Sequence, residues 1–218
     1  MQRIQALDLV FSNLRDVPGK SNSRRGLEKR ILDPGFAGSE AFFEVSVLAA
    51  ALSLQPESIV ELYPELSSGR PEFSVGSGER RIFFEATCFK LMGKGYLPKS
   101  GWALTTMQIS ESRLKSKFEN KKGQLPSHSP NVLLVGIMGI DPIEDQDLLA
   151  RRIIEGARQH FLTDSITSVL VLWFNPLSDL VLMRAERLDS RANELSTKET
   201  EVIQRLESRF RRPPKKIE

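Results

Sequence analysis

Three glutamates stand in segments whose other residues are mostly apolar. Glu44 lies within AFFEVSVLAAAL, Glu72 follows a proline at the start of PEFSV, and Glu85 lies in the middle of RIFFEAT. A buried carboxylate is costly unless it is paired with a cation or bound to a metal. Two or three convergent carboxylates can hold Mg²⁺ or Mn²⁺ through oxygen ligands, and such an ion polarises a phosphate and lowers the pKa of its bound water. The pattern is therefore typical of a metal-dependent phosphodiesterase.

The spacing of two serines indicates which way Glu44 points. Ser39 can cap a helix that runs to about residue 55, and Ser46 and Ser53 mark its solvent-facing stripe. Glu44 stands two residues before Ser46 and is rotated by about 200° from it at helical pitch. We therefore expect Glu44 to point inward. The alternative is that it lies at the rim of the helix and reaches water.

Alternation along RIFFEAT places Glu85 on a strand with apolar groups on both faces. Ile82 and Phe84 share one face, whereas Phe83 and Glu85 share the other. A strand with two apolar faces is expected in the interior of a sheet. A carboxylate on such a strand has a function or a partner, and an ordinary buried salt bridge is the alternative.

The elements that must position these glutamates alternate between helical and extended patterns. A helix is expected over residues 4–14, before turn-forming residues at 18–26. The later elements expected are the helix from Ser39, paired strands around the turn at 76–79, a helix over 110–120, a buried strand over 131–140, a helix over 147–161, strands over 168–174 and 179–186, and a helix over 197–212. This order predicts an α/β fold with a central mixed β-sheet flanked by helices.

We divide the chain into three parts. Residues 1–35 form an N-terminal helical extension, residues 36–190 form the α/β core, and residues 191–218 form a charged helix with a basic tail. The final helix carries an apolar stripe, available for packing or dimerisation, that consists of Val202, Leu206 and Phe210.

Composition restricts the classes of protein. The 218 residues carry a formal net charge of +3, and the pI of about 9.1 is a weak basic bias compatible with nucleic acid. The single Cys88 excludes an internal disulfide and a zinc site of clustered cysteines, and it is typical of a reducing cytosol. The only histidines, His128 and His160, lack the spacing of a zinc site or a catalytic triad. No apolar run is long enough to cross a bilayer, so we expect a cytoplasmic protein without a membrane partner.

In order and spacing, these segments resemble the PD-(D/E)xK nuclease superfamily, also called restriction endonuclease-like. The resemblance covers residues 38–140 and rests on the helix glutamate, the Pro-Glu pair, FFEAT, the later ENKKGQLP and the buried strand NVLLVGI. It implies a restriction endonuclease-like core that hydrolyses phosphodiester bonds in nucleic acid. It also implies that Glu72 and Glu85 bind Mg²⁺ or Mn²⁺, that Glu44 assists through the metal or its water shell, and that a homodimer is possible.

Two positions depart from the pattern of that superfamily. Glu72 stands where aspartate is usual and preserves the carboxylate. Thr87 stands where the catalytic lysine is usual, and a threonine cannot supply a positive charge against phosphate. Neither Lys90, on the opposite strand face, nor Lys94, in a glycine-rich loop, is a convincing replacement.

A lysine on a later helix is the better substitute. Lys121 lies on the apolar stripe of the helix SRLKSKFENKK, and Gln124 follows one turn later. We expect both side chains to converge on Glu85, as the resemblance implies. The alternative is that Lys121 only extends along the surface beside Gly123. The candidate catalytic residues are therefore Glu44, Glu72, Glu85, Lys121 and Gln124.

Two classes of function remain. The first is an active metal-dependent nuclease, which the three carboxylates favour. The second is a catalytically inactive nuclease-like module that binds nucleic acid or protein, which Thr87 favours.

Overall fold

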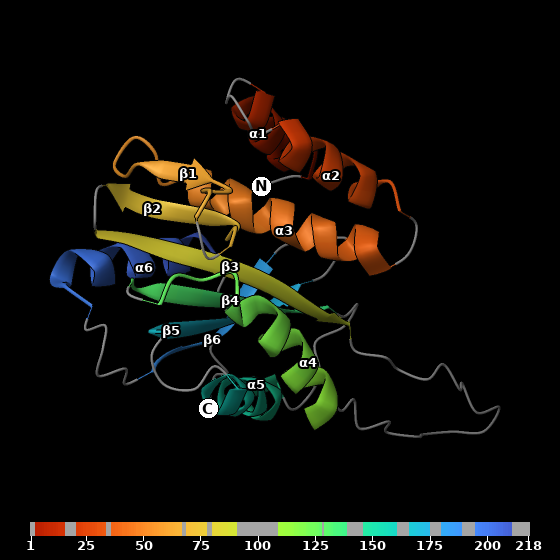
Figure 1. The fold of residues 1–218 in the computed structure, drawn as a ribbon, viewed down its shortest axis with the longest axis vertical. Helices are drawn as coiled ribbons and strands as arrows, with labels where there is room; N and C mark the ends of the chain where they lie inside the picture. The colour runs from red at the N-terminus through yellow and green to blue at the C-terminus, as the bar shows by residue number, and fades with distance from the viewer. Residues whose placement is uncertain are drawn as a thin grey trace, which may run out of the picture.

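The protein folds into a six-stranded mixed sheet that is covered by helices on both faces (Figure 1). The computed structural model describes residues 3–15, 21–33, 36–66, 69–77, 80–90, 109–127, 129–138, 146–160, 166–174, 180–188 and 195–210. The helices are α1 Arg3–Arg15, α2 Ser21–Ile31, α3 Phe36–Leu52, α4 Glu111–Lys122, α5 Gln146–His160 and α6 Thr197–Arg209. The strands are β1 Val60–Leu62, β2 Phe73–Ser77, β3 Arg80–Lys90, β4 Asn131–Met138, β5 Ser168–Phe174 and β6 Leu180–Arg187. The predicted α/β fold with a central mixed sheet is confirmed.

The strands lie in the sheet in chain order, from β1 to β6. β1 pairs with β2, and β2 with β3, in antiparallel orientation; β3, β4 and β5 run parallel to one another, and β6 is antiparallel to β5. β3 is thus an interior strand, as its two apolar faces predicted. The expected burial of β4 on both faces is also confirmed, because all eight of its residues are buried.

Each face of the sheet has its own hydrophobic cluster. Side chains from α1, α2, α3 and α6 pack with one face, and those from α4 and α5 pack with the other. Figure 1 shows α3 and α4 on opposite sides of the sheet. Alternate residues of β3 enter the two clusters: Ile82 and Phe84 belong to the cluster that contains α3 and α6, whereas Phe83 and Phe89 belong to the cluster that contains α4 and α5. The sheet therefore holds two separate helical layers in place.

Close backbone approach at Gly136 brings α3 down onto the sheet. A Cβ added at this position in β4 would lie 2.6 Å from the ring of Phe43. The ring of Phe43 also packs edge to face against Phe174 of β5, at 5.6 Å between centroids. Because Phe43 and Glu44 are adjacent, this contact fixes the height of Glu44 above the sheet.

The N-terminal region differs from the sequence prediction. Residues 4–14 are helical as expected, but the expected turn at 18–26 is wrong from Ser21 onward, where α2 begins. The local sequence is a poor helix former, yet Leu27 is fully buried in the cluster below it, and Arg24 pairs with Glu28 at 2.8 Å. Tertiary packing thus outweighs the weak local preference.

Other observed element boundaries also differ from the predicted ones. Ser39 is not a helix cap, because α3 begins one turn earlier at Phe36. β1, which pairs with β2, was not expected at all. The final helix ends at Arg209; Leu206 and the capping residue Phe210 are buried in the chain's own core, and Val202 is partly buried against it. The apolar stripe therefore serves packing, one of the two roles expected for it, and the homodimer stays a prediction.

Candidate active site

The site begins where β2 and β3 separate. β2 starts at Phe73, opposite Phe84, while β3 continues to Lys90 alongside β4. Just beyond the pair Phe73–Phe84, the backbone N–H of Ala86 donates to the Glu72 carboxylate, with 3.0 Å between N and Oε2. A side chain thus takes the place of a strand partner, and it brings the Glu72 carboxylate next to Glu85.

Lys121 lies between these two carboxylates. Its ammonium contacts the Glu85 carboxylate and lies 3.3 Å from Glu72 Oε1. The helix that carries it is fixed by the buried side chains of Leu114 and Phe118, on the same stripe as Lys121. The Glu85 side chain is fully buried and that of Lys121 is 22% exposed. The expected convergence of Lys121 on Glu85 is therefore observed.

Gln124 reaches the same carboxylate from the end of α4. With its amide nitrogen turned towards Glu85, it donates to the two carboxylate oxygens at 2.7 and 3.2 Å. This end of the helix lies against Gly69, where an added Cβ would be 2.5 Å from the Gln124 Cα. A larger residue at position 69 would push Gln124 away from Glu85.

Glu44 is buried, as predicted, and is held by two groups that sequence reasoning missed. Tyr63 donates its hydroxyl to Glu44 Oε1 at 2.5 Å, and Arg30 contacts Oε2 at 2.6 Å. Tyr63 also donates its backbone N–H to the carbonyl of Glu72 at 2.8 Å, from a left-handed backbone conformation with φ of 47°. Tyr63 thus ties two of the three predicted carboxylate residues together. No spacing in the sequence signals this role.

These groups surround a cavity of about 220 Å³. Its lining residues are Arg30, Glu40, Phe43, Glu44, Glu72, Ala86, Thr87 and Lys121. Lys117, one turn before Lys121, contacts Glu40 at 2.6 Å and the Cys88 carbonyl at 2.7 Å. Side chains from both helical layers and from the sheet therefore meet at one point.

Burial and mutual repulsion govern the protonation of the acidic groups. Burial and the charge of Glu72 raise the pKa of Glu85 well above its ordinary value, and Lys121 opposes that shift. Burial also raises the pKa of Glu44, with Arg30 and Tyr63 opposing. Burial lowers the pKa of Lys121, but the nearby carboxylates of Glu72 and Glu85 outweigh it and give a net increase. Lys121 therefore remains an ammonium at neutral pH.

The donor set suits a hard divalent cation. Glu72 and Glu85 offer converging carboxylate oxygens, and one ammonium cannot neutralise both when they are ionised. These two residues would hold Mg²⁺ or Mn²⁺. Glu44 differs because it has a cation of its own: Arg30 contacts one of its oxygens and the Tyr63 hydroxyl donates to the other, whereas Glu72 and Glu85 share one ammonium. Across the described ranges, no three histidine, cysteine, aspartate or glutamate side chains are grouped as a metal site.

The remaining candidates from the sequence are lysines, histidines and the cysteine. The side chain of Lys90, Lys94 and His128 fall outside what the structure describes, and His160 Nε2 lies 3.9 Å from Glu111 on α4. Cys88 is buried, and burial raises the pKa of its thiol. Among the described helices, none is long and apolar enough to cross a membrane.

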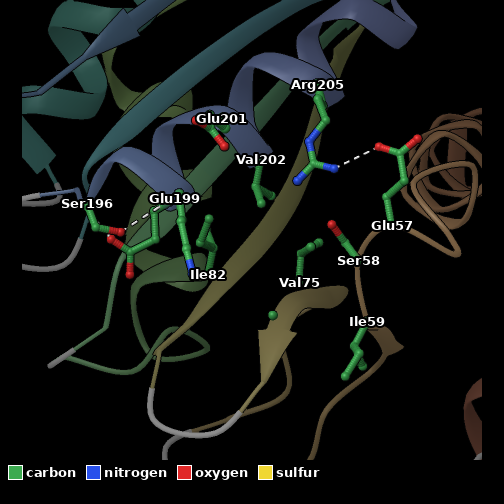
Figure 2. A pocket seen from close by; sticks show the side chains of 12 residues that line it. Glu57, Ser58, Ile59, Val75, Ile82, Ser196, Glu199, Glu201, Val202 and Arg205 are labelled. Atoms are coloured by element: carbon green, nitrogen blue, oxygen red, sulfur yellow. Dashed lines mark hydrogen bonds and ion pairs between the residues drawn. The ribbon is translucent and has the colours of Figure 1, made fainter.

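A larger cavity, of about 520 Å³, lies between α6 and the β1–β2 edge of the sheet (Figure 2). At one end Arg205 and Glu57 pair at 2.9 Å, and at the other Glu199 is engaged with Ser196 in the cap of α6 (Figure 2). These two pairs are separate from each other, whereas Glu72 and Glu85 converge on the one ammonium of Lys121.

We expect Tyr63→Phe to lower the free energy of unfolding by about 1.5–3 kcal/mol, because the buried Glu44 carboxylate loses a hydrogen bond. Urea titration measures this change. Ser46→Ala is the control, since it removes a hydroxyl that bonds Phe42 on the outer side of the same helix and should cost less than about 0.5 kcal/mol. Equal losses in the two variants would contradict the assigned role of Tyr63.

The fold and the site together define an α/β protein with a lysine–carboxylate cluster where two strands separate. No protein-family model matches this chain, and no curated protein matches its sequence. Among solved structures it is similar to Pyrococcus furiosus SfsA, determined in complex with Ca²⁺, with 13% sequence identity and a TM-score of 0.26. The match covers 71% of this chain and 63% of the SfsA chain, less than two thirds of its length. At this level of similarity, the assignment of function depends on the geometry of the site.

Proposed function

We propose that this protein is a restriction endonuclease-like phosphodiesterase of the PD-(D/E)xK type that acts on nucleic acid with a divalent metal. One observation carries the proposal: the ammonium of Lys121, on α4, contacts both Glu85, on β3, and Glu72, just before β2. A lysine from a helix thereby supplies the charge that Thr87 cannot supply from the strand. Two carboxylates and a lysine at one point can hold a divalent cation and stabilise the charge that develops in phosphodiester hydrolysis.

Each residue of the candidate site has a distinct role in the proposed reaction. When bound, Mg²⁺ or Mn²⁺ supplies Lewis-acid stabilisation of the phosphate and lowers the pKa of a bound water. Glu72 and Glu85 bind the cation, and Gln124 fixes the orientation of Glu85. Lys121 places its positive charge where negative charge develops as water attacks phosphorus and the bond to the leaving sugar oxygen breaks.

Glu44 acts indirectly in this proposal. Its carboxylate lines the same cavity as Glu72, but Tyr63 and Arg30 occupy its oxygens. We assign to it the placement of water around the metal, with Arg30 balancing its charge. We therefore expect Glu44 to contribute less to catalysis than Glu85.

A second candidate is a catalytically inactive module that binds nucleic acid or protein. The pairing of charges favours it, because Arg30 neutralises Glu44, Lys117 neutralises Glu40, and Lys121 contacts the other two carboxylates. Such a cluster can be stable without a metal.

Cleavage assays separate the two candidates. Supercoiled plasmid, single-stranded DNA and a structured RNA are incubated with the protein and Mg²⁺ or Mn²⁺, with Glu85→Ala in parallel. Metal-dependent cleavage that the variant lacks supports the enzyme. Binding of these nucleic acids without cleavage in either metal supports the inactive module.

Affinity for Mn²⁺ should rise with pH above the ordinary titration range of a glutamate. The pKa of Glu85 is raised by burial and by the charge of Glu72, so above that range Glu85 still holds a proton that must leave before a cation binds. Titration calorimetry in two buffers of different ionisation enthalpy measures both the affinity and the released proton. An affinity that does not change with pH would argue against Glu85 as a ligand, and Glu61→Gln, at the exposed pair with Arg81, is the matched control.

A further inference from the structure

Thr87 carries a buried hydroxyl that has no hydrogen-bond partner among the described residues. Its side chain is 1% exposed, and it lines the 220 Å³ cavity together with Glu72 and Lys121. It stands two residues after Glu85 on β3, so both side chains emerge from the same face of the strand. The unpaired hydroxyl therefore adjoins the candidate metal ligands.

A hydroxyl in this position is unfavourable for the protein alone. Leaving a buried polar group without a partner destabilises the folded state, whereas valine would fill the same space in a strand without that penalty. The hydroxyl can both donate and accept a hydrogen bond, which suits a water molecule or a phosphate oxygen in the cavity. What it lacks is charge, and Lys121 brings charge to the same cavity.

We propose that the Thr87 hydroxyl positions the attacking water by a hydrogen bond, while Lys121 supplies the positive charge. This inference rests on the proposed nuclease function. Two groups thus replace the single lysine expected on the strand: the Thr87 hydroxyl orients the attacking water, and Lys121 supplies the positive charge. Thr87 is accordingly part of the working site and does not mark its loss.

The test compares Thr87→Val with Thr87→Ser in the full chain. Valine should lower kcat for plasmid cleavage by about 10- to 100-fold with KM unchanged, because the lost contact is made to the attacking water. Serine, which keeps the hydroxyl, should stay within about threefold of the wild type. The dissociation constant for Mn²⁺ should change less than about twofold in both variants, and the Tm of Thr87→Val should equal or exceed that of the wild type.

Ser74 provides the matched control. Its hydroxyl is also buried and without a partner among the described residues, but it lies on β2 opposite Phe83 and does not line the cavity. Ser74→Ala should leave kcat and KM unchanged. A general effect of removing buried hydroxyls would lower kcat in both variants and would overturn the proposal.

Three further results would count against the proposal. Thr87→Val that cleaves within threefold of the wild type shows that the hydroxyl has no part in the reaction. A rise in KM with unchanged kcat assigns the hydroxyl to ground-state binding of the phosphate. A lower Tm for Thr87→Val with weaker Mn²⁺ binding shows a structural role. Wild-type protein that cleaves no substrate is a different outcome, because it removes the nuclease function on which the inference rests.

Discussion

Glu85→Gln should abolish detectable Mn²⁺ binding and reduce cleavage by at least about 1,000-fold, since loss of the metal removes several kcal/mol of transition-state stabilisation. Glutamine keeps the size and the planar shape of the side chain but offers no negative charge to a cation. Glu85 is fully buried, and burial raises its pKa, so the neutral amide should be accepted without loss of the fold. Calorimetric titration with Mn²⁺ and plasmid cleavage measure the two effects on the same preparation.

Glu61→Gln is again the control for Glu85→Gln. Glu61 pairs with Arg81 at the β1 edge of the sheet, and both side chains are partly exposed. Its loss should leave metal binding and cleavage unchanged. A Glu85→Gln protein that binds Mn²⁺ with wild-type affinity would refute the assignment of the metal site, whatever its activity.

Lys121→Met should reduce cleavage by about 100- to 1,000-fold without loss of Mn²⁺ binding. Methionine keeps most of the length of the side chain but removes the charge that we assign to the developing phosphate anion. Glu72 and Glu85 then lack the ammonium that they share, so their attraction for a divalent cation should increase. The variant should be less stable than the wild type without metal, and Mn²⁺ should raise its Tm more than that of the wild type.

The opposite effects on metal binding distinguish the two variants. Glu85→Gln removes a ligand, whereas Lys121→Met removes a competitor for that ligand. Lys115→Met is the control, because Lys115 lies on the outer side of α4 and its pair with Glu119 is exposed. Weakened Mn²⁺ binding in Lys121→Met would show that the lysine organises the site and does not compete with the cation.

Moving the lysine provides an independent check on its role. In the double variant Thr87→Lys with Lys121→Met, the ammonium originates from the strand, where the superfamily pattern has it, and the helix no longer carries one. We expect the double variant to regain at least about tenfold of the activity that Lys121→Met loses. No recovery would indicate that the position of the charge on α4 is essential.

The parts of the site that were predictable depend on periodicity. Alternation on both sides of Glu85 identified an interior strand, and the helical stripe that contains Lys121 identified an inward-facing lysine. Both patterns arise from burial, which extends over several residues and so leaves a repeated signal. The sheet and the meeting of Lys121 with Glu85 could therefore be predicted from the sequence.

The groups that were missed leave no such signal. β1 has three residues, too few to show alternation, and α2 forms because Leu27 is buried against distant elements. Tyr63 reaches Glu44 from a left-handed backbone conformation that a tyrosine rarely adopts. The unpaired hydroxyl of Thr87 could not be predicted either, because threonine is a common strand residue whether or not its hydroxyl has a hydrogen-bond partner.

The site draws its side chains from three layers: Glu44 from one helical layer, Glu72 and Glu85 from the sheet side, and Lys121 from the other helical layer. A folding intermediate in which either layer of helices has not yet docked would contain a nearly complete sheet but no working site. A cation bound to the sheet carboxylates would favour the fully assembled state over such intermediates. The proposed metal-binding site would thus be a marker of complete folding, and its formation in refolding should coincide with the last docking step rather than with the appearance of β-structure.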